Sequence, residues 1–208
     1  MNNKLYLAST SPYRKQSLQQ LGLAFTTLSP GVDEGDFGAS KPQVLAQLLA
    51  DSKALTACNS LEPQTPGLII GGDQICWHDG NQLHKPGNRT TAIEQLQQMR
   101  GHEVTFYTAL SLVQAATCQV VYQHLDITKV TFRELTHQKI EQYIDAEQPF
   151  DCAGGFKVEG LGISLFERIE SQDPSALVGI SLIGLTSGLL ELGYPILEST
   201  LINSDHDS

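Results

Sequence analysis

The run Gly67-Leu68-Ile69-Ile70-Gly71-Gly72-Asp73 constrains the fold of this chain more than any other segment. Its three consecutive large apolar residues, bounded by glycines, are typical of a strand that is buried on both faces. Strands of that kind lie in sheets that helices cover. The segment therefore indicates an α/β protein, and it ends on a carboxylate at a point where α/β sheets commonly bind ligands.

Strand and helix patterns are mixed along the rest of the chain. Strands are expected at 5–8 and 25–28, with a long pair at 103–113 and 120–132 and short strands between 156 and 169. Helices are expected from Pro12 to Leu21, after Pro42, before Gly101, at 135–146 and at 181–192. We expect an α/β fold with a mixed, elongated central sheet, flanking helices and two lobes around a cleft. Residues 1–208 would form one domain, with residues 203–208 frayed.

The charge balance excludes one class of partner. The chain of 208 residues has 13 Lys and Arg against 23 Asp and Glu, a formal net charge of −10. Non-specific binding to nucleic acid depends on many cationic contacts, so no nucleic-acid partner is expected.

The chain shows no signal for export or membrane insertion. The apolar stretch at the N-terminus is too short for a signal peptide, and glycines, serines and a threonine interrupt the longest apolar stretch, 176–190. We expect a cytoplasmic protein without a membrane partner. Its four cysteines contain no C-x-x-C pair, so reduced thiols, buried or half-buried, are the expectation for Cys58, Cys76, Cys118 and Cys152.

Common catalytic motifs are missing from the sequence. It contains neither the P-loop pattern nor G-x-G-x-x-G after a strand, and it has no G-x-S-x-G elbow. A phosphate site, if present, must therefore be of another design.

The segment Ser9-Thr10-Ser11-Pro12-Tyr13-Arg14-Lys15 is the first candidate for such a site. Ser11 suits an N-cap and Pro12 the first helical position. Arg14 and Lys15 then fall in the first helical turn, where cations are unfavourable unless an anion neutralises them. Hydroxyls, helix N–H groups and two cations together indicate a phosphate or polyphosphate site, although an ordinary capped helix with solvated cations is the alternative.

Two acidic positions are candidates for metal binding or proton transfer. The loop Asp33-Glu34-Gly35-Asp36 either is a solvated turn or supplies a magnesium or manganese ligand. Asp73 either caps a turn or serves as a metal ligand or general base. Lys53 and Lys85 would matter only if the fold brings them to the same cleft.

These segments together resemble the Maf family of nucleoside triphosphate pyrophosphatases. The opening run 7–15, Val32-Asp33-Glu34, Gly72-Asp73-Gln74, Lys85-Pro86 and the run 151–155 follow the family's order, and the resemblance covers about Leu5 to Gly193. It implies hydrolysis of a nucleoside triphosphate to monophosphate and pyrophosphate with a divalent metal cation (Mg, Mn or Co). It also implies a fold like that of inosine triphosphate pyrophosphatase and a possible homodimer.

The resemblance also implies roles for individual residues. Asp73 matches the catalytic base and, with Glu34, the metal ligands; phosphate binding falls to Ser9, Ser11, Arg14, Lys15, Lys53 and Lys85. The residues that select the base would be Tyr13, Gln74 and Glu159. Close relatives carry Trp at the position of Tyr13.

Gln74, Glu159 and the run Asp151-Cys152-Ala153-Gly154 resemble the branch of the family that hydrolyses 7-methyl-GTP. Methylation at N7 makes guanine cationic, and an aromatic face beside a carboxylate suits a cation. The alternatives are a dTTP or UTP pyrophosphatase of the same family and a nucleotide-binding regulator that does not hydrolyse its ligand.

Overall fold

A computed structural model describes residues 4–32 and 41–196 of the chain. The first half contains β1 (Leu5–Ala8), α1 (Pro12–Gln20), β2 (Thr26–Leu28), α2 (Pro42–Asn59), β3 (Leu68–His78), β4 (Asn81–Leu83) and α3 (Arg89–Met99). The second half contains β5 (Glu103–Gln114), β6 (Gln119–Phe132), α4 (His137–Glu147), β7 (Phe166–Glu170) and α5 (Leu182–Glu191). The short 3-10 helices of the described residues are η2 (Ala153–Gly155), η3 (Leu161–Leu165) and η4 (Pro174–Val178).

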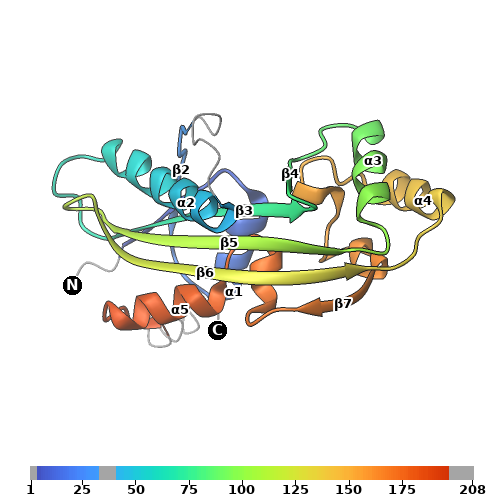
Figure 1. Ribbon diagram of the computed structural model, residues 1–208. Coiled ribbons are helices and arrows are strands. Elements are labelled where there is room, and N and C mark those ends of the chain that lie inside the picture. Colours follow the sequence, from blue (N-terminus) through green and yellow to red (C-terminus); the bar gives the residue numbers. More distant parts are fainter. Residues whose placement is uncertain (1–3, 33–40, 197–208) are drawn as a thin grey trace, which may run out of the picture.

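One mixed sheet connects the whole molecule. Its strands lie in the order β2-β1-β3-β5-β6-β7, and β4 pairs with β3. β1 runs parallel to β2 and β3, whereas the other pairings are antiparallel. The long strands β5 and β6 extend from one end of the molecule to the other (Figure 1). The α/β class, the mixed sheet and the long central pair are therefore confirmed.

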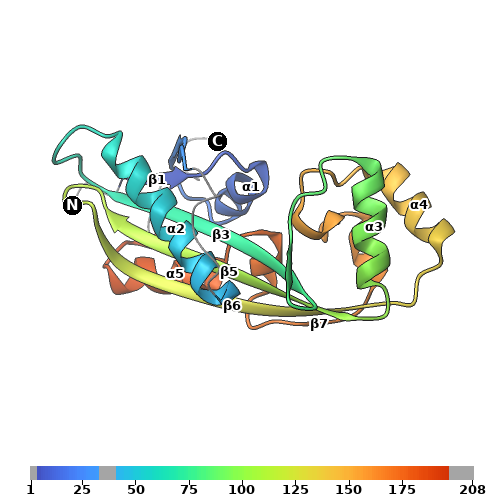
Figure 2. The ribbon, with the colours of Figure 1, turned by 45° about the horizontal axis from the view of Figure 1, so that its top comes forward.

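The helices form two lobes along this sheet (Figure 2). In the first lobe, α2 packs against β3 and β5 on one face, and α1 and α5 share an apolar cluster with β1 and β5 on the other. In the second lobe, α3 and α4 pack together with η2 around Phe106, Phe132 and Phe156. The predicted arrangement of two lobes is thus present.

Two details differ from the sequence expectation. β3 does not end at Asp73 but continues to His78, because β5 pairs with it throughout, from Leu68 to Trp77. Between 156 and 169 the predicted short strands are replaced by irregular backbone and turns up to residue 160 and by a 3-10 helix at Leu161–Leu165, and only β7 joins the sheet.

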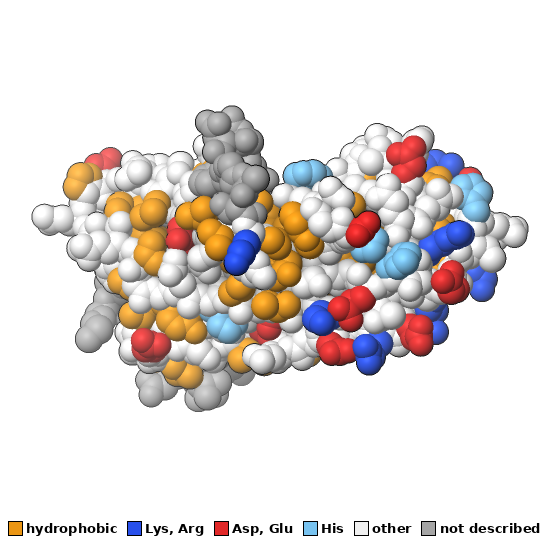
Figure 3. All heavy atoms as spheres, in the orientation of Figure 1, with side chains coloured by type: hydrophobic (Ala, Val, Ile, Leu, Met, Phe, Trp, Pro, Cys, Tyr) orange, Lys and Arg blue, Asp and Glu red, His pale blue; other side chains and the backbone are white. Residues whose placement is uncertain are grey.

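Charged and hydrophobic side chains gather on different parts of the surface (Figure 3). Charged side chains gather over the second lobe, where Arg89 pairs with Asp145 and Glu141. Hydrophobic side chains gather around α2, where Val44 is 48% and Leu48 41% exposed. No helix in the described part of the chain is long and apolar enough to cross a membrane.

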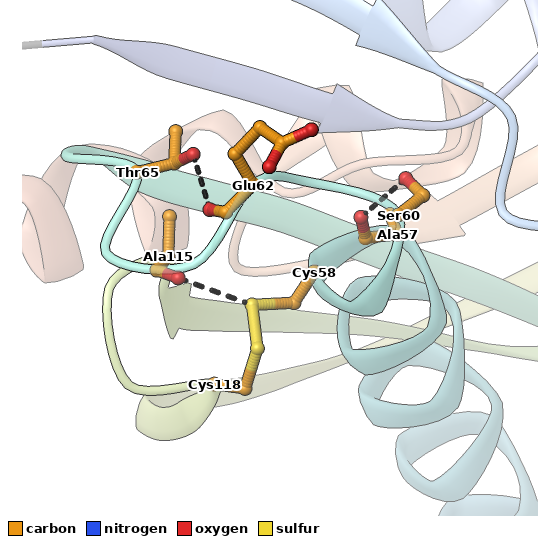
Figure 4. Close-up of a disulfide and its surroundings, with 7 residues drawn as sticks. All are labelled: Ala57, Cys58, Ser60, Glu62, Thr65, Ala115 and Cys118. Atoms are coloured by element: carbon orange, nitrogen blue, oxygen red, sulfur yellow. Dashed lines mark hydrogen bonds between the residues drawn. A yellow bond between two sulfur atoms is a disulfide. The ribbon is translucent and has the colours of Figure 1, made fainter.

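The expectation of four reduced thiols is wrong for one pair. Cys58 at the end of α2 and Cys118 in the β5–β6 turn form a disulfide, although they are 60 residues apart in sequence (Figure 4). No C-x-x-C spacing could indicate this pairing, because the fold alone brings the two cysteines together. Cys76 and Cys152 are free, buried and half-buried respectively, as expected.

Opening the disulfide should lower stability without disturbing its surroundings. Cross-linking residues 60 apart restricts the unfolded chain by about 4 kcal/mol in the loop-entropy account. We expect Cys118→Ala to lose up to that amount in urea unfolding, since the released Cys58 thiol can donate to the Ala115 carbonyl 3.3 Å away. Wild-type protein in reductant should match the variant, and reductant should leave the variant unchanged. Equal stability of oxidised wild type and variant would contradict this account.

Candidate active site

A cleft of about 600 Å³ lies between the two lobes. It is lined from the first lobe by the β1–α1 segment, α2 and β3, and from the second by the loops after β4 and α4. Its charged lining residues are Arg14, Lys53, Asp73, Lys85, Asp151 and Glu159. The fold thus brings most of the predicted site residues into one cavity.

The N-terminus of α1 forms one wall of the cleft. Ser11 is the N-cap, and its hydroxyl accepts a hydrogen bond from the Arg14 N–H at 3.4 Å. Ser9 Oγ accepts from the Ser11 N–H at 3.1 Å and from Arg14 Nη1 at 3.4 Å. No acidic residue occupies the first turn of α1. This arrangement of hydroxyls, helix N–H groups and a cation suits an anionic ligand.

Lys15 lies apart from the main cleft. It is exposed and borders a smaller hollow with Thr27, Leu28 and Ser29, which shares the Ser9–Pro12 wall. Lys15 therefore reaches the Ser9–Pro12 segment from this smaller hollow and not from the main cleft.

Asp73 is the most tightly held carboxylate in the cleft. It is 6% exposed, and its Oδ1 accepts a hydrogen bond from Lys53 Nζ at 2.6 Å. Arg14 Nη2 lies 4.0 Å from the same oxygen. Lys53 is itself buried on α2, so a lysine that could have been a surface residue instead points into the site. Asp73 thus lines the cleft as a buried carboxylate whose Oδ1 is oriented by Lys53.

The position of Asp73 in the sheet explains why it faces the cleft. The expectation of a strand end was wrong for β3 itself, but β1, its parallel neighbour, ends at Ala8, and the last register pair is Leu7 with Ile70. Asp73 thus lies beyond the carboxyl end of the parallel part of the sheet, where its edge is open to the cleft.

The η4 segment fixes two site residues and was not anticipated from the sequence. Arg14 Nε donates to the Gly179 carbonyl at 2.8 Å. Gln74 Nε2 donates to the carbonyl of Ala176 at 2.9 Å and to Thr108 Oγ1 at 3.1 Å. With its amide nitrogen committed to these acceptors, Gln74 has its Oε1 left to meet a ligand.

Asp173 holds η4 in place. Its carboxylate accepts hydrogen bonds from Ser181 Oγ and the Ile183 N–H, both at 2.7 Å, and from the N–H and hydroxyl of Ser175. Burial works to raise the pKa of Asp173, but these hydrogen bonds outweigh it and lower the pKa below its usual value. The ionised carboxylate is therefore the form that the loop stabilises.

Asp173→Asn should destabilise the protein in a manner that depends on pH. The amide group would place a donor against two donors, at a cost of about 2–3 kcal/mol near neutral pH. Because the folded pKa is lowered, the contribution of Asp173 is complete above its unfolded pKa and is lost as the pH falls through the folded value. The difference in unfolding free energy between wild type and variant should shrink below about pH 4. If the difference in unfolding free energy between wild type and variant is the same at pH 7 and pH 3, the ionised Asp173 carboxylate does not stabilise the loop as described. Asp79→Asn, on an exposed turn, is the control.

The opposite wall of the cleft carries Asp151 and Cys152, which meet Tyr13. The Tyr13 hydroxyl donates to the Asp151 carboxylate at 3.2 Å, and Cys152 Sγ lies 3.5 Å from the same hydroxyl. Burial is the main cause that raises the pKa of Tyr13, and burial likewise raises the pKa of Cys152 to about 11. Both groups are neutral at pH 7, so Cys152 brings no charge to this wall. Glu159 and Lys85, both exposed, line the same cleft.

The sequence patterns did not identify Asp151 as an individual site residue. It is 138 residues from Tyr13, and only its place beside Cys152 in a run shared with the Maf family indicated that the segment matters.

Among the described residues Asp73 could hold a metal ion, but no preformed cage surrounds it. No group of three His, Cys, Asp or Glu side chains capable of holding a metal ion occurs within residues 4–32 and 41–196. Glu34 lies outside the described residues. The Asp73 carboxylate fits a divalent cation that takes one or two carboxylates and completes its shell with substrate phosphates.

The fold and the cleft are those of an α/β protein that can bind a polyphosphate beside a buried carboxylate. Residues 4–192 match the family described as Maf-like protein, and the chain belongs to that family.

Several curated relatives carry the same name. A 7-methyl-GTP pyrophosphatase from Vibrio vulnificus (strain CMCP6) is 46% identical over 94% of this chain and 98% of its own length. A protein of that name from Paraburkholderia xenovorans is 45% identical over 93% of this chain and 94% of its own length. Another, from Xanthomonas oryzae pv. oryzae (strain KACC10331 / KXO85), is 48% identical over 93% of this chain and 98% of its own length. Among solved structures, a HAM1 protein from Coxiella burnetii is 12% identical, covers 91% of this chain and 99% of its own, and has a TM-score of 0.49.

Proposed function

We propose that this protein is a nucleoside triphosphate pyrophosphatase that hydrolyses 7-methyl-GTP to 7-methyl-GMP and pyrophosphate. The observation that carries the chemistry is the buried Asp73 carboxylate, held by Lys53 and facing a cleft with the α1 N-terminus. The substrate is supported by relatives named 7-methyl-GTP pyrophosphatase that match nearly the whole chain.

The proposed reaction uses Asp73 as general base. Lys53 orients the Asp73 carboxylate through its contact with Oδ1, and the carboxylate accepts the proton of a water molecule that attacks the α-phosphorus. Negative charge builds on the departing pyrophosphate, and Arg14, Lys53, Lys85 and the N–H groups of α1 lie around the cleft to balance it. Ser9 and Ser11 orient the phosphates through the same α1 segment, and Lys15 adds a cation from the neighbouring hollow.

A divalent cation belongs to the proposal. Asp73 and Glu34 would hold Mg, Mn or Co together with phosphate oxygens. The metal would supply neutralisation of phosphate charge and polarisation of the phosphoryl group.

The proposed selection of the base involves Tyr13, Gln74 and Glu159. Tyr13 supplies an aromatic face, Gln74 an acceptor, and Glu159 a carboxylate for the N–H donors of guanine. Glu159→Gln should lower the ratio of kcat/KM for 7-methyl-GTP to that for GTP by about tenfold, because the amide loses one charge near a cationic base. Unchanged relative rates in steady-state kinetics would remove Glu159 from this role.

The decisive experiment is pyrophosphate release from a panel of nucleotides. 7-methyl-GTP, GTP, UTP, dTTP and CTP are each supplied with magnesium, manganese or cobalt, and a chelator serves as the metal-free control. We expect preferential cleavage of 7-methyl-GTP. Preference for UTP or dTTP would retain the chemistry and overturn the substrate, whereas binding without turnover would favour a regulator.

Homodimerisation and a cytoplasmic location stay predictions. Light scattering at several protein concentrations tests homodimerisation.

A further inference from the structure

The hydrogen bond between Tyr13 and Asp151 joins the two walls of the cleft. Tyr13 lies in the first turn of α1, and Asp151 lies in the loop between α4 and η2 of the other lobe. The hydroxyl is shared between both carboxylate oxygens, at 3.2 and 3.3 Å. Asp151 thereby fixes the ring of Tyr13 in the cavity wall.

Two carboxylates lie on the second-lobe wall of the cleft. Asp151 and Glu159 both line the cavity, and Cys152, whose Sγ lies 3.5 Å from the Tyr13 hydroxyl, is a neutral thiol. Lys157, the cation whose charge acts on Cys152, does not line the cleft, and its Nζ contacts the Glu147 carbonyl at 3.4 Å. Of the cations that line the cleft, Arg14 and Lys53 are turned toward Asp73. Lys85 lines the second-lobe wall, in the loop whose Gly87 N–H donates to the Phe150 carbonyl at 2.9 Å.

This surrounding suits a cationic aromatic ligand. A ring that carries a positive charge is attracted by the face of Tyr13 and by a nearby carboxylate. When a phenol donates a hydrogen bond to a carboxylate, electron density on its ring increases, which strengthens the attraction for a cation stacked upon it. Guanine methylated at N7 is such a cation, whereas guanine is neutral.

We propose that Asp151 is a fourth specificity-determining residue, which selects a cationic base over a neutral one by its own charge and by polarising and positioning Tyr13. The inference rests on the proposed function. It also gives a physical role to Tyr13, whose hydroxyl reaches a carboxylate across the cleft.

Four variants separate this role from a structural one. In Asp151→Asn the side chain keeps its shape but loses its charge, so the kcat/KM ratio of 7-methyl-GTP to GTP should fall about tenfold, mainly through KM for 7-methyl-GTP. Tyr13→Phe retains the carboxylate but loses the hydrogen bond, so the ratio should fall by less. Asp151→Glu retains the charge and should keep a ratio within about threefold of wild type. Asp79→Asn, on a turn that does not line the cleft, is the control and should leave the ratio unchanged.

The outcomes distinguish this inference from the function on which it rests. If wild type cleaves 7-methyl-GTP preferentially but folded Asp151→Asn keeps the wild-type ratio, the role of Asp151 is overturned and the proposed function stands. If wild type shows no preference for 7-methyl-GTP, both are overturned. Should Asp151→Asn not fold, Tyr13→Phe decides, because an unchanged ratio there excludes the paired mechanism. Thermal unfolding midpoints report folding of each variant.

Discussion

Asp73→Asn is expected to lower turnover of 7-methyl-GTP by about a thousandfold while the protein remains folded. General-base catalysis contributes about 10²- to 10⁴-fold to reactions of this kind, and an amide cannot take the proton from water. The substitution nearly preserves the shape of the side chain, so Lys53 keeps an oxygen to contact. Removing the charge still weakens a buried 2.6 Å ion pair, so some loss of stability accompanies the loss of activity.

The matched control for this prediction is Asp51→Asn. Asp51 lies on α2, two residues before Lys53, and accepts hydrogen bonds from Gln47 and Gln123 rather than facing the cleft. Asp51→Asn makes the same change from carboxylate to amide on α2, the helix that carries Lys53, and the variant should retain turnover. Steady-state pyrophosphate release and far-UV circular dichroism are the measurements. An Asp73→Asn protein that folds and turns over within tenfold of wild type would remove the carboxylate from the mechanism.

Gly71→Ala is expected to cause the second largest effect, by separating α2 from β3. A Cβ at Gly71 would lie 2.3 Å from the Ala50 carbonyl oxygen and 2.8 Å from the Ala54 Cβ, so the helix backbone must move. Lys53 adjoins Ala54, and its contact with Asp73 depends on this close approach. We expect a loss of about 3 kcal/mol in unfolding free energy and at least a tenfold loss of turnover.

Gly72→Ala provides the comparison on the next residue of the same strand. Because successive residues face opposite sides of a sheet, its Cβ would point away from α2. There it meets the Ala109 carbonyl oxygen at 3.4 Å and Arg14 Nε at 3.6 Å, which are ordinary contacts. Its stability in urea should remain within about 1 kcal/mol of wild type. Equal stabilities of the two variants would show that α2 does not pack against Gly71 as described.

Local chemistry made parts of this site predictable. Ser11 and Pro12 specify the start of α1 through capping and ring geometry, and the structure begins the helix there. The Val- and Thr-rich runs likewise became β5 and β6. Asp73 was expected at a ligand-binding edge of the sheet, and it does line the cleft. The expected reason, that its own strand ends there, was wrong, because the strand that ends there is β1 and not β3.

What escaped prediction depends on contacts between distant parts of the chain. The Gly179 carbonyl that receives Arg14 is 165 residues away from it, and Cys58 meets Cys118 only because α2 runs back along the sheet. Neither hydrophobic periodicity nor residue spacing indicates which distant residues come into contact. The burial of Lys53 is of the same kind, since helical pattern alone assigns lysine to the surface.

The continuous β5–β6 pair has a mechanical consequence. Both strands belong to the two lobes, which therefore share one hydrogen-bonded ladder (Figure 1). Any widening of the cavity has to bend a ladder of hydrogen bonds that extends from Glu103 to Gln114, and stiffness of that ladder resists it. A change in the width of the cleft therefore requires flexure of a β-ribbon, and expression of either half alone would leave an incomplete sheet.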